Sequence, residues 1–345
     1  MIKVQTLLSK LVMRPFLVSG VVLIGFFTGC EWTPAGPDEL SIEELTPVLE
    51  SLVLSDETIS VDGLGDSDFQ EDEYYEVGNI GRVSSYLAKI LPDTLWPSKE
   101  MGVRWQRRIS ERNSYFRLDS VAVDTAYGTI SRILTGSFHL VVWARNDSGE
   151  KVILDSLNKP LEIGSARRIL FVRGDNTADS SLGWRIAGRT AVLGTAGEKV
   201  SLSSIAFVET DGTTLNVQRG AVLSTFFRWN ELPRFPSLDT LQCYAQVENH
   251  GSEFPLYFGE RVIVRRVGRV DQARFTNRAR LSDNGRDLDQ LALDNTFSGS
   301  FIINQLPHKY RVFHIFVEVT DLASFLVPAE GYHCEFIGFP YLVVD

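Results

Sequence analysis

The stretch YRVFHIFVEVTD, residues 310–321, is largely apolar on both of the faces that it would present as a β-strand. Successive side chains of a strand point to opposite faces of the sheet. Arg311 aside, one face carries Val312 and Phe316, and the other carries Phe313, Ile315, Val317 and Val319. Strands that are apolar on both faces are typical of a sheet that is covered on both sides. We therefore expect residues 310–319 to form a central strand with a layer of protein on each face.

The sequence around this stretch, residues 196–345, consists of short β-patterned runs separated by turn signals. Asp211–Gly212, for example, favours a tight hairpin turn. Runs at this spacing without a helical period indicate a β-sandwich. The segment from Leu281 to Asp321 also resembles Ig-like or fibronectin-III-like modules of exported bacterial proteins, which carry an acidic Asp/Asn/Gly stretch before their last strands. The resemblance implies an all-β Ig-like sandwich over residues 196–345.

The preceding segment, residues 41–195, begins with a helical pattern and continues with β-patterned runs. Ser41 and Glu44 have the spacing of a capping box at a helix N-terminus. Pro47 leaves two possibilities open, a helix that starts at Ser41 or one that starts at Pro47 with Thr46 as its N-cap. Helices followed by a curved antiparallel sheet are an α+β pattern. We therefore expect an α+β domain over residues 41–195.

The strand succession of this domain resembles that of NTF2-like domains. The resemblance rests on SVAVDTAYGTISRILTG (120–136) and on ARRILFVRG…GWRIAGRT (166–190), which contains the Trp-Arg-Ile sequence of that family's last strands. It implies a ligand pocket between the sheet and the helices. The candidate residues for lining such a pocket are Tyr86, Trp105, Tyr127, His139 and Trp184.

The first thirty residues have the features of an export signal. Three basic residues precede a short apolar run, which is too short for a membrane-spanning helix of about 20 residues. The run ends in FTGC (27–30), which resembles the lipobox of bacterial lipoproteins. In that family a signal peptidase cuts before the cysteine, and the cysteine thiol carries a lipid.

The lipobox resemblance implies a signal peptide over residues 1–29, lipid attachment at Cys30 and a tether over residues 30–40. It implies a chain anchored on the bacterial cell envelope, facing the periplasm or the cell surface. A cleaved secretory peptide that leaves a free cysteine and an uncleaved anchor are the alternatives. Two or three acyl chains would hold the protein firmly on a membrane.

The charge of the chain argues against nucleic acid as a partner. The formal net charge is −10, whereas nucleic-acid binding depends on basic surfaces. We expect the membrane as a partner through the N-terminal lipid, together with envelope proteins or polymers. Arginines such as Arg261 and Arg265 fall on one face of a predicted strand, whereas Arg266 faces away. They form either a solvated face that pairs with nearby acids or a basic face that docks an acidic surface.

If the chain is exported, as its N-terminus predicts, the two cysteines beyond the lipid site, Cys243 and Cys334, are in a compartment that permits disulfides. They are either separate buried thiols or a disulfide, because connectivity does not follow from sequence.

An acidic loop provides the one candidate metal site. Its carboxylates are Asp283, Asp287, Asp289 and Asp294. Calcium takes six to eight oxygen ligands from such loops, but the EF-hand spacing is not met. The loop is either a structural calcium site or a solvated loop with turn-forming side chains.

The sequence contains no G-x-S-x-G, H-E-x-x-H, P-loop or dinucleotide motif. We expect a non-catalytic binding or scaffolding role without a cofactor other than structural calcium. Two alternatives stay open. A pocket enzyme of the isomerase or dehydratase type would follow from an NTF2-like first domain, and a carbohydrate- or polymer-binding sandwich would show exposed aromatic residues on one sheet face.

Overall fold

The computed structural model describes most of the chain beyond residue 40. The described residues are 41–56, 58–59, 70–73, 101–174, 181–250, 260–267, 278–305, 312–327 and 330–345. The predicted signal peptide, tether and lipid site lie outside the described residues, as does Tyr86. Residues 41–345 form one compact unit.

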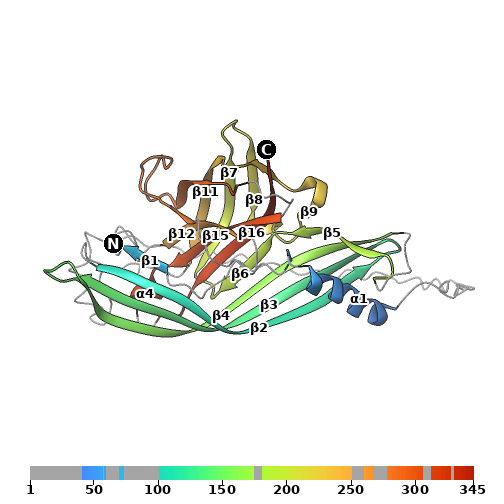
Figure 1. Cartoon of the computed structure of the whole chain (residues 1–345), viewed down its shortest axis with the longest axis horizontal. Helices are drawn as coiled ribbons and strands as arrows, with labels where there is room; N and C mark the ends of the chain where they lie inside the picture. The colour runs from blue at the N-terminus through green and yellow to red at the C-terminus, as the bar shows by residue number, and fades with distance from the viewer. Residues whose placement is uncertain are drawn as a thin grey trace, which may run out of the picture. The chain divides into compact units, whose positions relative to one another are not determined.

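Nearly all described elements are β-strands, arranged in two sheets (Figure 1). The main path of the larger sheet runs through β1 (Gln70–Glu73), β2 (Met101–Val121), β3 (Thr125–Arg145), β4 (Lys151–Arg173), β6 (Val192–Ala196), β16 (Cys334–Val344), β15 (Val312–Asp321), β12 (Glu260–Val267) and β13 (Arg278–Leu281). Off this path lie β5 (Trp184–Thr190), β9 (Phe226–Arg228) and β10 (Arg234–Pro236). The smaller sheet runs through β14 (Thr296–Ile302), β11 (Thr240–Asn249), β7 (Val200–Val208) and β8 (Thr214–Gln218).

The prediction of a central strand is confirmed for residues 312–319 by β15, which is buried along its whole length between β12 and β16. Residues 310 and 311 lie outside the described residues. Phe313, Ile315, Val317 and Val319 pack into a core that is shared with the smaller sheet, including Phe207 and Leu241. Phe316, on the opposite face, packs into a second core with residues of β2, β3 and β4. The two sheets therefore form a β-sandwich, as expected, with β15 and β16 as its middle layer (Figure 1).

The predicted fold class, an NTF2-like α+β domain followed by a separate Ig-like domain, is wrong. One sheet runs through both halves of the chain, because β6 pairs with β4 on one side and with β16 on the other. The expected boundary between residues 195 and 196 falls inside β6. Long strands from the N-terminal half of the chain cover the second face of β15.

Strands β2, β3 and β4, which we call the ladder, are unusually long at 21, 21 and 23 residues; strands usually have three to ten residues. They form two successive antiparallel hairpins, with a turn at residues 146–149 between β3 and β4. Irregularities in pairing at Ser110 and Asp119 of β2 and at Leu154 of β4 interrupt the register. Such β-bulges bend a strand and increase its twist, which allows the ladder to curve over β15 and β16.

Helix α1 (Ile42–Ser55) packs on one end of the ladder. Ser41 and Glu44 form the predicted capping box, in which each side chain bonds to the backbone N–H of the other residue. Pro47 lies inside the helix, so the alternative of a helix that starts at Pro47 is wrong. Leu45, Leu49 and Val53 are the buried face of the helix, and they pack with residues of β3, β4 and β5. The short helix α4 (Ala323–Leu326) follows β15.

Candidate functional site

The residues predicted to line one pocket do not lie together in the described part of the chain. Trp105 of β2 pairs with Leu140, whereas Tyr127 lies thirteen residues earlier on β3. At about 3.3 Å per residue, this separation is roughly 43 Å of strand. Trp105 is buried in the core between the ladder and β15, and Trp184 is buried in a different core beneath α1. The resemblance to NTF2-like domains therefore misplaced these aromatic residues.

The other two predicted residues lie on the ladder itself. Tyr127 is half-buried against Phe226, with ring centroids 5.4 Å apart, and the guanidinium of Arg168 stacks over its ring. His139 is half-buried on β3, and partial burial together with the charge of Arg108 lowers its pKa. Both side chains have structural neighbours on the ladder, and they do not face a common cavity.

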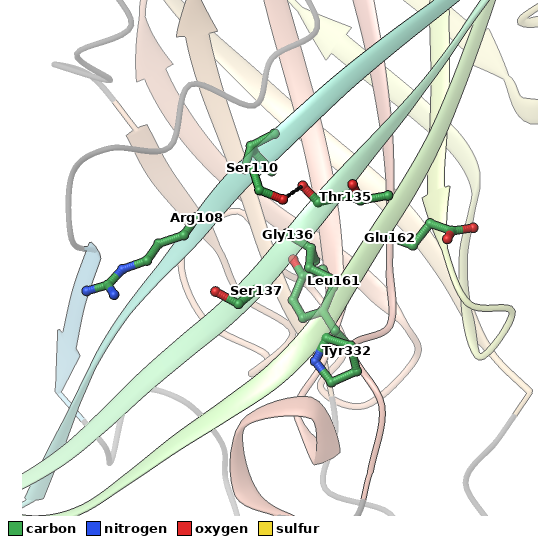
Figure 2. Close-up of a pocket in the computed structure, with 10 residues that line it drawn as sticks. Arg108, Ser110, Thr135, Gly136, Ser137, Leu161, Glu162 and Tyr332 are labelled. Carbon is green, nitrogen blue, oxygen red and sulfur yellow. Dashed lines mark hydrogen bonds between the residues drawn. The ribbon is translucent and has the colours of Figure 1, made fainter.

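A groove crosses the middle of the ladder and has a volume of about 870 Å³ (Figure 2). We call it the ladder groove. It is lined by Arg108, Ile109, Ser110, Thr135, Gly136, Ser137, Pro160, Leu161, Glu162 and Tyr332. The pairing of β2 with β3 is interrupted at Ser110, directly beside Gly136. The hydroxyl of Ser110 bridges this irregularity by donating to the carbonyl oxygen of Thr135 at 3.1 Å.

The rim of the groove carries both signs of charge. Figure 2 shows Arg108 and Glu162 pointing away from each other on opposite sides of the groove, with Gly136 and Ser137 between them. Both charged residues are exposed. The arrangement offers hydrogen-bond donors and acceptors along a path that crosses three strands, which suits an extended polar chain.

The apolar part of the groove is fixed by a buried ionic cluster. Tyr332 lines the groove and also belongs to the core under the ladder. Its hydroxyl accepts a hydrogen bond from Nε of Arg107 at 2.9 Å, and burial raises the pKa of this hydroxyl well above its usual value. Arg107 also pairs with the carboxylate of Glu318 on β15, and this carboxylate pairs in turn with Arg265 on β12. The floor of the groove is therefore tied to β2 and, through Glu318 and Arg265, to β15 and β12.

The structure corrects the expectation that the arginines of β12 form a solvated or docking face. Arg261 and Arg265 share a face, as predicted, and Arg266 differs from them in being only half-buried. However, Arg261 and Arg265 are 2% and 4% exposed, so they form neither a solvated face nor a docking face. Arg265 is bound to Glu318, and Arg261 stacks over the ring of Trp105.

Sequence reasoning missed the residues of the ladder groove. The one local signal was the Gly136–Ser137 pair in LTGSF, where the apolar pattern breaks as it does between two strands. The structure instead has one continuous strand there. The groove depends on what lies beside Gly136 on β2, which no local pattern contains.

Cys243 and Cys334 are free thiols in two different cores, so the possible disulfide between them is not formed. Cys243 faces the core between the two sheets, and Cys334 faces the core under the ladder. Burial raises the pKa of Cys334 to about 12 and also raises the pKa of Cys243. The thiolate is the reactive form of cysteine, so both groups are protected.

We expect no rapid reaction of Cys243 or Cys334 with Ellman's reagent in the native Cys30→Ser chain at pH 8. After denaturation without a reductant, the same chain should show two reactive thiols. Rapid reaction before denaturation would mean that a thiol is exposed, and the absence of reaction afterwards would mean that the two are bridged.

The structure brings together three of the four acidic loop residues. Carboxylate oxygens of Asp283, Asp289 and Asp294 lie within 4.8 Å of one another, and Asp287 is outside this group. The carboxylates of Asp283 and Asp289 already accept backbone N–H bonds, from Asn295 at 2.9 Å and from Leu291 at 3.3 Å among others. These bonds are typical of turn-forming aspartates. Calcium binding stays a prediction.

The outer face of the smaller sheet tests the alternative of a carbohydrate-binding sandwich, which predicts exposed aromatic residues on one sheet face. In strands β7, β8, β11 and β14, three of the four aromatic residues point into the core; these are Phe207, Phe297 and Phe301. The fourth, Tyr244, is half-buried, and its hydroxyl donates to Gln242 at 2.9 Å. A single tyrosine is not the row of exposed aromatic rings that this alternative predicted.

Comparison of the chain with protein-family models, with curated proteins and with solved structures found no match. Among the described residues, no helix combines the length and the apolar character that crossing a membrane requires.

Proposed function

We propose that this chain is a lipid-anchored protein of the bacterial cell envelope that binds an extended segment of a partner protein in the ladder groove. The anchor rests on the lipobox-like FTGC sequence and on Cys30 as the lipidated residue. The role is non-catalytic. The observation that carries the binding role is the groove itself, which combines an apolar floor with hydroxyl groups and with charges of both signs.

The chemistry of the groove favours a protein segment over a polymer of one charge sign. Arg108 and Glu162 offer a cation and an anion on opposite sides. The hydroxyls of Ser110, Thr135 and Ser137 can donate to and accept from a peptide backbone. An extended peptide presents alternating donors and acceptors together with side chains of both charges, and it is recognised by such surfaces. The pocket-enzyme alternative depended on an NTF2-like pocket between the sheet and the helices, which the described part of the chain does not form.

Site-specific photo-crosslinking in cells tests the groove. A benzoylphenylalanine at Ser137 should give one discrete crosslinked product, and the charge reversals Arg108→Glu and Glu162→Lys should each reduce it at least fivefold. Ser131 provides the matched control, because it lies on the same face of β3, six residues or about 20 Å away. Equal crosslinking at both positions would contradict a specific groove.

The anchor is tested separately by fractionation of cells that express the Cys30→Ser chain. We expect the wild-type chain in the membrane fraction and the variant in the soluble exported fraction, because the variant lacks the thiol that takes the lipid. A variant that stays with the membrane would contradict the anchor, whatever the outcome at the groove.

A further inference from the structure

A second pocket lies on the smaller sheet, away from the ladder groove. It has a volume of about 230 Å³, and we call it the end pocket. It is lined by Val208, Glu209, Thr210, Thr240, Gln242, Leu288 and Ser300. All of these except Leu288 come from β7, β11 and β14 or from the turn that follows β7. Leu288 belongs to the acidic loop, so the pocket forms where this loop meets the sheet.

The acidic loop is held in one conformation by its own carboxylates. Asp289 accepts backbone N–H bonds from Asn284, Gly285 and Leu291, on both sides of Leu288. The bonds to Asp283 fix the C-terminal end of the loop in the same way. The wall that carries Leu288 is therefore ordered before any partner binds, which lowers the entropic cost of binding.

Two large apolar side chains beside the end pocket are exposed to solvent. Leu238 is 58% exposed and Ile302 is 48% exposed. Ile302 pairs directly with Thr240 of the pocket wall, and Leu238 lies two residues before Thr240. Leu238 also has a φ of +61°, a left-handed conformation that is strained for a branched side chain. Apolar groups that are exposed next to one another mark interaction surfaces, and Leu238 and Ile302 both lie next to Thr240 of the pocket wall.

The remaining side of the end pocket is acidic. Glu209 lines the pocket, and partial burial followed by the charges of Asp211 and Asp239 raises its pKa. Asp239 accepts a hydrogen bond from Thr210 at 3.0 Å, which places this carboxylate beside the pocket lining as well. Three carboxylates therefore lie at this edge, and they would attract a cationic partner.

We infer that the end pocket docks a basic segment of another protein, which inserts one large apolar side chain between Val208 and Leu288. A cavity of about 150 Å³ holds a benzene molecule, so 230 Å³ accommodates one aromatic or branched side chain. Leu238 and Ile302 would pack against the flanking residues, and lysines or arginines would lie against Glu209 and Asp239. This inference does not depend on the ladder groove or on the lipid anchor.

Fluorescence anisotropy with a defined peptide tests the inference. The probe is a ten-residue peptide with one central phenylalanine flanked by lysines, and the two matched probes replace the phenylalanine with alanine or the lysines with glutamate. We expect the first probe to bind at least tenfold more tightly than either matched probe, and its affinity to fall with salt. Equal binding of all three probes, or no binding of the first probe, would overturn the inference.

Variants of the chain locate the binding. Leu288→Trp should fill the end pocket and weaken binding of the first probe at least tenfold, and Ser300→Tyr should do so from the opposite wall. The control is Ile153→Ser, which removes a 69% exposed apolar side chain from the far part of the ladder. Circular dichroism checks that each variant is folded. Full affinity in both folded pocket variants, or an equal loss in the control, would overturn the inference.

Discussion

Replacement of Glu318 by glutamine is expected to lower the free energy of unfolding by about 3–5 kcal/mol. Glu318 is fully buried on β15, and its carboxylate binds Arg107 of β2 and Arg265 of β12. These two arginine residues are 1% and 4% exposed. Without the carboxylate, two buried cations lose the anion that neutralises them, and burying an uncompensated charge is costly.

Urea unfolding of the wild-type and Glu318→Gln chains measures this effect. The matched control is Arg117→Gln, which breaks a salt bridge between Arg117, whose side chain is 78% exposed, and Asp119. Exposed salt bridges contribute about 0–1 kcal/mol, so the control should unfold almost like the wild type. A loss below about 1 kcal/mol at Glu318 would show that the cluster does not hold the ladder on β15.

The stability difference between the wild-type and Glu318→Gln chains should depend on pH. Burial raises the pKa of Glu318, but the neighbouring charges of Arg107 and Arg265 outweigh it and lower the pKa from 4.5 to about 2. Because the pKa of Glu318 is lower in the folded chain than in the unfolded chain, its carboxylate stabilises the fold fully at pH values above the unfolded-state pKa. This stabilisation is lost as the pH falls through the folded-state pKa. The stability difference between wild type and Glu318→Gln should therefore be constant above about pH 5. It should shrink by an amount on the order of 3 kcal/mol between pH 4.5 and pH 2. A difference that does not change over this range would contradict the pairing.

The central position of β15 was predictable because it depends on local information. Phe313, Ile315, Val317 and Val319 follow one another on one face without interruption, and Val312 and Phe316 lie on the other face of the same ten residues. The hairpin at Asp211–Gly212 was predictable for the same reason, since turn residues act locally. What covers the second face of β15 was not predictable, because Arg107 and Glu318 are 211 residues apart in the sequence.

The ladder was missed because its irregularities resemble strand ends. The interruptions at Ser110 and Leu154 shift the period of two by one residue. Gly136 looks like a break between two strands, whereas β3 continues through it. The α+β interpretation followed from the helical pattern that precedes these β-patterned runs, and the pocket that the NTF2-like resemblance implied placed Trp105 and Tyr127 together. The register along β3 separates them.

Gly136 lines the ladder groove and also lies in close contact with the backbone of β2. A Cβ atom at this position would overlap the carbonyl oxygen of Arg108 and lie 2.9 Å from its carbonyl carbon. Both atoms belong to the backbone of β2, so no change of rotamer can relieve the overlap. Gly136→Ala should therefore force β2 away from β3 beside Ser110, at a cost of about 3 kcal/mol in unfolding free energy.

Gly164→Ala is the matched control for this substitution. Gly164 also lies in the ladder, on β4, and a Cβ atom there would have no neighbour within 4 Å. Because alanine restricts the unfolded chain more than glycine does, this variant should be unchanged or up to about 1 kcal/mol more stable. Equal stability of the two variants in urea unfolding would show that β2 and β3 are not in close contact at Gly136.

Crosslinking and peptide binding test Gly136→Ala in a second way, besides its unfolding free energy. A shift of β2 moves Arg108 and Ser110, which line the groove, while it leaves the end pocket on the smaller sheet unchanged. We therefore expect Gly136→Ala, when studied at a temperature where it is folded, to lose crosslinking from Ser137 and to keep its affinity for the basic peptide. Loss of both activities together would mean that the substitution disturbs the smaller sheet as well as β2 and β3. Loss of crosslinking alone would show that the irregularity in β2 shapes the groove, because it is the one element that the substitution displaces directly.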